Sequence, residues 1–440
     1  MYKSRKTRLP NGCSIIAMPM PDRELATIMI GVKTGSRVDP PNRKGLAHLL
    51  EHMLFRRSAA YAGDSAMDRA IAKIGGLSNA STGPEMTWYW LRVPKAKAGE
   101  ALKIVAAMVL KPKITPKSLL LEKRITFQEL ANEHNDVRSR ANCLMEDLTF
   151  AGTDLHSGYA EYLENLNDYS IKDIRDFYRV WYHPGNMAVA ILGGDTDRLI
   201  AQAAAIFGRL KAATAPAPWL PFMPQEPAQP YLHAKMEGST MALRLAMRSV
   251  PLEHRDRIAT QIVGKLLGNY DNRMSRLFQG LRKHAGYIYE VNSSSDHLSD
   301  AGIFEFYTLT LQPFAQAVMA QIISELQRAV REPFSALEIA MAKQALTTEV
   351  LALECNLEDL GVKLLMRELL FRKDFDLGQE LDRIAECSEA DIHRVAKQLF
   401  TRERRYLASV GPEPLPVITD VTSISRPPKA AMKKSNRKRP

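Results

Sequence analysis

Cysteine is scarce in this sequence. Four cysteines occur among 440 residues, and they form no C-x-x-C pair and no spacing typical of a disulfide framework. This scarcity argues against a small secreted scaffold that is held together by disulfides. We interpret the four as reduced, buried or incidental thiols: Cys13, Cys143, Cys355 and Cys387.

Long apolar runs are also missing. No run approaches the roughly 18 residues that a membrane-spanning helix needs. The first residues are basic, but the apolar run that follows, 13–18, is shorter than the core of a signal peptide and ends at Pro19. The sequence therefore predicts neither a membrane span nor an export signal, and we expect a cytoplasmic protein.

Acidic residues are absent from the end of the chain. Residues 421–440 contain seven Lys or Arg and no Asp or Glu, so this segment carries +7 of the net charge of +11 and leaves +4 for the rest. Such a composition predicts a basic disordered tail. Because no aromatic residue lies between its charges, a nucleic-acid partner is not favoured.

The remainder has the composition of a globular protein, with 45% hydrophobic and 25% charged residues. A chain of 440 residues exceeds one ordinary hydrophobic core, which predicts two or three domains. Six prolines between residues 216 and 230 predict an extended, semi-rigid linker. The predicted domains are 1–215 and 231–420, with the linker 216–230 between them and the tail 421–440 after them.

The most informative stretch is Gly45-Leu-Ala-His-Leu-Leu-Glu-His-Met-Leu-Phe55, which predicts one amphipathic helix. At 3.6 residues per turn, His48, Glu51 and His52 share one face, opposite a face of leucine and methionine. Two imidazoles one turn apart can bind one Zn²⁺, and a carboxylate lies between them. This is the H-x-x-E-H pattern of inverted zincins. The alternative is a helix with merely exposed histidines.

Two carboxylates further along favour the metal site. Glu122 and Glu129 are seven residues apart in a predicted helix over 116–138, so they lie on nearly the same face. A second helix could therefore direct both carboxylates toward the same zinc.

Together these residues resemble the insulinase/pitrilysin metallopeptidase family, and most closely its short members akin to the mitochondrial processing peptidase. The spacing fits: 69 residues separate His52 from Glu122, and six separate Glu122 from Glu129. Further stretches resemble the family at 33–37, 75–82 and 177–187. The similarity extends over about residues 8–412.

Chemistry and resemblance together assign the candidate site. His48, His52 and Glu129 would hold one zinc per chain and leave a fourth position open to water. Glu51 would act as general base on that water, and Glu122 would orient a ligand or tune the metal from outside. The resemblance also implies that Asn79, Ala80 and Ser81 form an edge strand that binds an extended peptide through its backbone.

The segment 275–289 resembles a second family motif. Arg282 and Tyr289 match the pair that binds substrate backbone and stabilises the developing oxyanion. Taken alone, an Arg and a Tyr seven residues apart are equally consistent with an ordinary helix and strand. The chain departs from the usual pattern at Lys283, His284 and Tyr287, which leaves substrate preference open.

The order of predicted elements indicates an α+β fold. Strands are expected within 7–36 as a pair, then at 77–82, 86–93 and 188–194, with helices at 66–74, 98–110, 116–138, 141–150, 171–181 and 197–210. The second half repeats this order with a strand at 241–249, a helix at 258–267, further strands, long helices at 313–331 and 336–370, and a closing helix and strand within 389–410. It contains no H-x-x-E-H, which predicts a duplication in which only the first copy kept a metal.

The functional hypothesis is a zinc metalloendopeptidase that cuts extended peptides or small unfolded polypeptides inside a dimeric chamber, as a homodimer or with a related chain. In the family's clamshell arrangement, Arg282 and Tyr289 would reach the partner's zinc. The alternative is a non-catalytic peptide-binding or partner subunit. The complete set of ligands, base and Arg/Tyr pair favours the enzyme, because inert copies usually lose a ligand or the glutamate.

Overall fold

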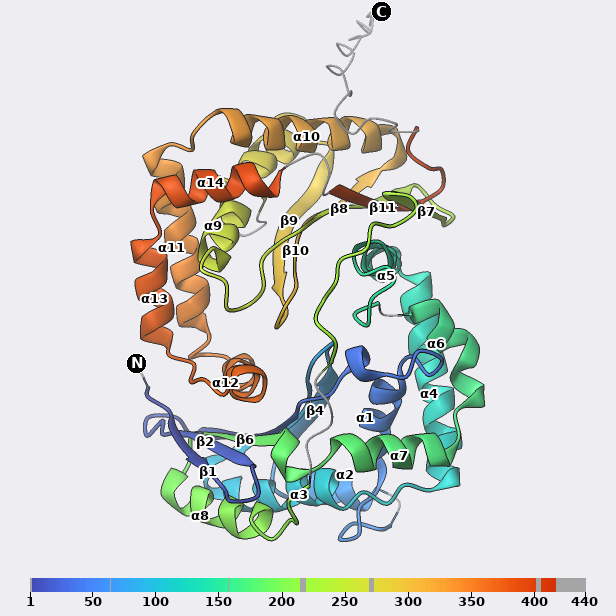
Figure 1. The fold of residues 1–440 in the computed structure, drawn as a ribbon, viewed down its shortest axis with the longest axis vertical. Coiled ribbons are helices and arrows are strands. Elements are labelled where there is room, and N and C mark those ends of the chain that lie inside the picture. Colours follow the sequence, from blue (N-terminus) through green and yellow to red (C-terminus); the bar gives the residue numbers. More distant parts are fainter. Residues whose placement is uncertain are drawn as a thin grey trace, which may run out of the picture.

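The computed structural model describes residues 2–416, except 64, 157, 214–218, 269–272 and 401–404. The predicted tail, 421–440, and part of the predicted linker therefore lie outside the described residues. Two sheets, each with its own helices, form two lobes that face each other (Figure 1).

The first sheet has six strands in the order β1-β2-β6-β3-β5-β4. Neighbouring strands are antiparallel, except that β2 runs parallel to β6. The region 7–36 was predicted to hold two strands, and β1 is an additional strand that pairs with β2 at the sheet edge. The strands are β1 (Arg5–Arg8), β2 (Ser14–Met18), β3 (Leu25–Val32), β4 (Leu77–Thr82), β5 (Thr87–Pro94) and β6 (Met187–Leu192).

The second sheet repeats this topology without the extra edge strand. Its order is β7-β11-β8-β10-β9, again antiparallel except for the pair β7 and β11. β7 therefore corresponds to β2, and β9 corresponds to β4, as a duplication requires. The strands are β7 (Tyr231–Lys235), β8 (Thr240–Arg248), β9 (Ile288–His297), β10 (Gly302–Leu311) and β11 (Arg405–Gly411).

Helices of the first half follow the predicted pattern, except that α6 was not predicted and one predicted helix ends early. The helix predicted over 116–138 ends at Asn135, because Asp136 is extended and its carboxylate accepts a hydrogen bond from the Ser139 amide to begin the next helix. The helices are α1 (Leu46–Arg56), α2 (Ala66–Lys73), α3 (Ala98–Leu110), α4 (Pro116–Asn135), α5 (Val137–Thr149), α6 (Tyr159–Asn165), α7 (Ile171–Trp181) and α8 (Thr196–Phe207).

Helices of the second half differ more from the prediction. The prediction of a single helix over 336–370 is wrong, because the first helix ends at Ala352. Asn356 then caps a new helix: its side-chain oxygen accepts hydrogen bonds from the Glu358 and Asp359 amides. Neither α13 nor β7 was predicted. None of the helices that the structure describes is long and apolar enough to cross a membrane. The helices are α9 (Arg257–Leu267), α10 (Ala315–Arg331), α11 (Ala336–Ala352), α12 (Leu357–Phe371), α13 (Leu377–Glu386) and α14 (Glu389–Leu399).

The two halves exchange one helix each. Helix α12 belongs to the second half in sequence, yet its Leu360 and Leu364 pack with Met29 and Leu192 of the first sheet. Helix α5 of the first half packs in the same way on β8 and β11 of the second sheet. Both helices lie between the lobes in Figure 1. Each sheet is thus covered by apolar side chains from the other half, which joins the halves through two hydrophobic contacts.

A buried arginine links the halves a third time. The Arg37 side chain is fully buried, and its guanidinium contacts Glu85 at 2.6 Å, Asp154 at 3.0 Å and Asp300 of the second half at 2.6 Å. Arg37 Nη2 also donates to the carbonyl of Leu220, in the segment that connects the halves. One guanidinium therefore holds together carboxylates from three separate segments.

Replacing Arg37 by Ala is expected to destabilise the protein by about 3–5 kcal/mol, because it leaves the buried Glu85 and the two partly buried aspartates without their partner. The midpoint of urea unfolding measures this change. The control is Arg5→Ala, which removes an exposed ion pair with Asp197 and should change stability by less than about 1 kcal/mol. Equal effects of both substitutions would show that the Arg37 network does not join the halves.

Candidate metal centre

The helix that carries H-x-x-E-H begins at a glycine for two physical reasons. Gly45 has φ +81°, which disfavours other residues, and a Cβ there would lie 2.2 Å from the Tyr162 ring. The Asp39 carboxylate accepts hydrogen bonds from the backbone amides of Gly45 at 2.7 Å and Ala47 at 2.9 Å. These amides lie at the start of the helix and have no partner within it. The predicted apolar face, with Leu46, Leu49, Leu50, Met53 and Leu54, is buried.

The side chains of His48, His52 and Glu129 converge. They are the one group of three or more His, Cys, Asp or Glu among the described residues whose ligand atoms lie close enough to hold a metal ion. The two Nε2 atoms are 3.2 Å apart, and His52 Nε2 lies 3.3 Å from Glu129 Oε2. Ligands at about 2.0–2.1 Å in a tetrahedral zinc site are about 3.3–3.4 Å from each other. The third separation, from His48 Nε2 to Glu129 Oε1, is 3.9 Å, and the Glu129 side chain is exposed enough to turn closer. The donor types and two of the three separations therefore fit zinc.

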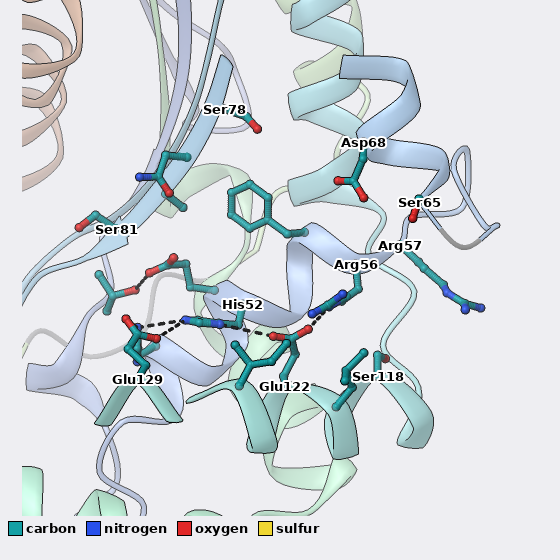
Figure 2. A pocket seen from close by; sticks show the side chains of 18 of the residues that line it. His52, Arg56, Arg57, Ser65, Asp68, Ser78, Ser81, Ser118, Glu122 and Glu129 are labelled. Atoms are coloured by element: carbon teal, nitrogen blue, oxygen red, sulfur yellow. Dashed lines mark hydrogen bonds and ion pairs between the residues drawn. The ribbon is translucent and has the colours of Figure 1, made fainter. Parts of the chain in front are cut away.

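Glu122 contacts the ligand group from the side opposite the metal position. Its carboxylate lies 3.4 Å from His52 Nδ1, the ring nitrogen that points away from the other ligands, and it also pairs with Arg56 one turn further along α1. Figure 2 shows His52 between Glu129 and Glu122, with Arg56 on the far side of Glu122. Glu122 is 2% exposed, and a buried carboxylate without a partner would be costly. The Arg56 guanidinium compensates its negative charge.

The two histidines differ in charge when no metal is bound. Burial, reinforced by the neighbouring His52, lowers the pKa of His48 to about 4. Burial also opposes protonation of His52, but its contacts with Glu122 and Glu129 raise its pKa to about 10. His48 is therefore neutral and His52 is protonated. Because metal ligands bind as neutral imidazoles, His52 must lose this proton when a metal enters.

Glu51 lies on the same face of α1 but outside the ligand group. It is 7% exposed, and its Oε2 accepts a hydrogen bond of 2.6 Å from the Thr82 hydroxyl on β4. Burial raises the pKa of the Glu51 carboxyl, and the bond from Thr82 partly opposes this. A buried carboxylate with a raised pKa, beside a metal site, is suited to accept and return a proton.

Strand β4 forms one wall of the site. It is the outermost strand of the first sheet and pairs only with β5, so its other edge faces the cavity. The cavity has a volume of about 980 Å³. It brings together eight of the predicted site residues: His48, Glu51, His52, Asn79, Ala80, Ser81, Glu122 and Glu129.

Arg282 and Tyr289 lie elsewhere. The residues that line the metal cavity all fall between His48 and Glu133, in the first half, so the pair is not part of this wall. The Arg282 guanidinium stacks 4.6 Å from the centre of the Tyr289 ring and donates to the Tyr289 carbonyl. The Tyr289 side chain is 65% exposed. The two residues therefore form one exposed unit on the second half.

The second half has a cavity in the equivalent place, with different chemistry. α9, β9 and α11 correspond to α1, β4 and α4, and a cavity of about 210 Å³ lies between them. The buried pattern of the helices places Lys265 where α1 has His52 and Glu349 where α4 has Glu129. Lys265 Nζ and Glu349 Oε2 are 2.5 Å apart. The ammonium group of Lys265 has no lone pair and cannot coordinate a metal. This explains why the cavity of the second copy does not form the same metal site.

The sequence analysis missed three residues of the site: Arg56, Thr82 and Tyr162. Arg56 follows His52 by four residues, so helical spacing alone could have placed it beside the site. Thr82 ends the strand that was predicted to bind an extended peptide. Tyr162 is 114 residues from His48 and has no signal in the sequence.

The duplicated α+β fold and a His/His/Glu group in an open cavity, beside a buried glutamate, define a metal-dependent hydrolase. Comparisons with known proteins agree. The model of the insulinase family (peptidase family M16) matches residues 15–161, and the model of the peptidase M16 inactive domain matches residues 168–346. The chain belongs to the insulinase (M16) family, with a catalytic-type first domain and a second domain of the inactive type.

Relatives match over nearly the whole chain. An uncharacterised zinc protease of Streptomyces coelicolor is 27% identical over 93% of this chain and 89% of its own length. One of Mycobacterium leprae is 27% identical over 92% and 91%. Among solved structures, a protease from Helicobacter pylori superposes with a TM-score of 0.85 at 20% identity, covering 93% of this chain and all of the other. The chain is a zinc protease of this family.

Proposed function

We propose that this chain is a zinc-dependent endopeptidase that hydrolyses extended peptides or small unfolded polypeptides, with one zinc per chain. The observation that carries the proposal is the complete set around one cavity: three converging side chains of zinc-binding type, a buried glutamate outside them, and an open strand edge. A non-catalytic subunit would not need the glutamate. Its presence and its bond from Thr82 favour the enzyme.

The residues divide the work as follows. His48, His52 and Glu129 would hold the zinc, which supplies a water of lowered pKa and polarises the substrate carbonyl. Glu51 accepts the proton of the attacking water and passes it to the leaving amine. The Thr82 hydroxyl fixes one Glu51 oxygen, and Glu122 keeps the ring of His52 oriented.

The substrate would bind as an added strand. Asn79 and Ser81 of β4 are exposed, while Ala80 between them is half-buried. An extended peptide pairing with this edge gains backbone hydrogen bonds without requiring a particular sequence. Such binding suits a peptidase of broad specificity and would place the scissile bond in the cavity beside the ligand group.

Arg282 and Tyr289 would complete the site by donating to the oxyanion. Because the metal cavity is lined by the first half alone, we propose that this pair comes from a second chain in a dimer, either another copy or a related family member. The protein would act in the cytoplasm, with no nucleic-acid or membrane partner.

Removal of the metal tests the proposal directly. 1,10-Phenanthroline is expected to abolish cleavage of an internally quenched peptide, and added Zn²⁺ should restore it, because the chain supplies only three ligands and a base. The isomer 1,7-phenanthroline, which does not chelate, is the control. A wild-type protein that binds zinc but cleaves no peptide in a broad library would support the non-catalytic alternative.

A further inference from the structure

The two metal-facing histidines use their ring nitrogens in the same way. Their Nε2 atoms face each other and Glu129, so each Nδ1 points outward. His52 Nδ1 is next to the Glu122 carboxylate. His48 Nδ1 lies 3.5 Å from the hydroxyl oxygen of Tyr162 on α6. Each ligand histidine thus has one outer partner, and the partners differ in charge.

We propose that Tyr162 is a positioning residue for the metal centre: its hydroxyl oxygen accepts a hydrogen bond from His48 Nδ1–H. A neutral imidazole carries its proton on one nitrogen, and the bond made by that nitrogen decides which one it is. A proton held on Nδ1 leaves the Nε2 lone pair directed at the metal. Tyr162 thereby sets both the tautomer and the ring orientation of the first ligand.

The surroundings hold Tyr162 in this place. Its side chain is 5% exposed and stacks on Tyr169, with ring centres 6.2 Å apart and planes within 5° of parallel. Its ring also occupies the space where Gly45 lacks a Cβ, at the start of the zinc helix. The same aromatic ring therefore fixes the entry of α1 and contacts His48 one turn later.

Thr126 provides the next link. It lies on α4 between Glu122 and Glu129, and its hydroxyl is fully buried. This hydroxyl is next to the Tyr162 phenol. When the Tyr162 oxygen accepts a hydrogen bond from His48, the Tyr162 O–H can donate one to Thr126. That bond would give the buried Thr126 hydroxyl oxygen a partner.

Charge explains why the two histidines have different partners. The Glu122 carboxylate beside His52 is compensated by Arg56. The group beside His48 is instead the phenol of Tyr162, which is neutral and needs no compensating cation. A phenol orients the imidazole without adding charge.

The test compares zinc affinities of wild type and Tyr162→Phe, measured by competition with a chromophoric chelator. Loss of an outer partner typically weakens metal binding by 10- to 100-fold, and we expect about tenfold here because the lost partner is neutral. Tyr169→Phe is the matched control: it removes the stacked phenol, which donates to the Lys44 carbonyl, and should leave zinc affinity unchanged. Thermal unfolding of the zinc-free proteins shows whether each variant is folded.

The tautomer provides a readout that does not depend on metal. Zinc-free His52→Ala protein lacks the protonated His52 ring that otherwise donates to His48 Nε2. In this background, long-range ¹H–¹⁵N spectra should show His48 with its proton on Nδ1, and adding Tyr162→Phe should move that proton toward Nε2. Should Tyr162→Phe fail to fold, Thr126→Val tests the same chain of hydroxyls and should weaken zinc binding in the same direction, by less. Unchanged affinity and tautomer in the folded variants would overturn the proposal.

This inference rests on zinc binding by His48, His52 and Glu129, which the wild-type protein tests separately. If wild type binds no zinc, the proposed function fails. If wild type binds zinc and Tyr162→Phe binds it equally well with an unchanged His48 tautomer, only the role of Tyr162 fails.

Discussion

A Glu51→Gln chain is expected to lose peptide hydrolysis by roughly 10²–10⁴-fold while keeping its zinc, because it loses a general base and no ligand. Glu51 is buried, and glutamine has nearly the same shape. Its amide oxygen can still accept the hydrogen bond from Thr82, so the local structure should persist. The amide cannot accept the proton of a water, and the chemical step therefore fails.

Turnover of a quenched peptide and zinc content by mass spectrometry are measured on the same samples. Glu129→Gln should lose both, because Glu129 is a ligand. Glu133→Gln is the matched control, since Glu133 lines the same cavity but is not in the ligand group, and it should retain both. Loss of zinc from Glu51→Gln, or turnover equal to wild type, would remove Glu51 from the role of base.

The local parts of this site could be predicted because they depend on short-range spacing. His48, Glu51 and His52 share a face through the helical period alone, and Glu122 and Glu129 do so through a seven-residue interval. The structure brings all of them to one cavity. The lack of a metal motif in the second half was likewise visible in the sequence, whereas the edge position of β4 was implied only by the family resemblance.

Long-range packing could not be predicted in the same way. The exchange of α5 and α12 between the halves leaves no periodic signal, because each helix has an ordinary apolar face whichever sheet it covers. The break after Ala352 depends on the cap at Asn356, inside a stretch of strong helix formers. Tyr162 reaches His48 only because α6 packs on α4 and brings the Tyr162 ring to the start of α1. Tertiary contacts of this kind are not encoded by spacing.

The position of Arg282 and Tyr289 leads to the second large expected effect. Tyr289→Phe removes a donor to the oxyanion, which typically costs 10²–10³-fold in rate. If the pair acts on the zinc of a partner chain, a site consists of the first half of one chain and the second half of another. A homodimer of either Glu51→Gln or Tyr289→Phe chains then has two defective sites.

Mixing the two inactive chains should restore activity. In a mixed dimer, one site combines the intact Glu51 of the Tyr289→Phe chain with the intact Tyr289 of the Glu51→Gln chain, and the other site lacks both. The recovered rate should approach roughly half of the wild-type value in those dimers if the sites act independently. A mixture of Glu51→Gln with Glu129→Gln is the control, because both lesions lie in the first half and no site becomes whole. Absence of recovery, despite subunit exchange shown by differently labelled chains, would mean that the pair acts within its own chain or that a different family member supplies the second half.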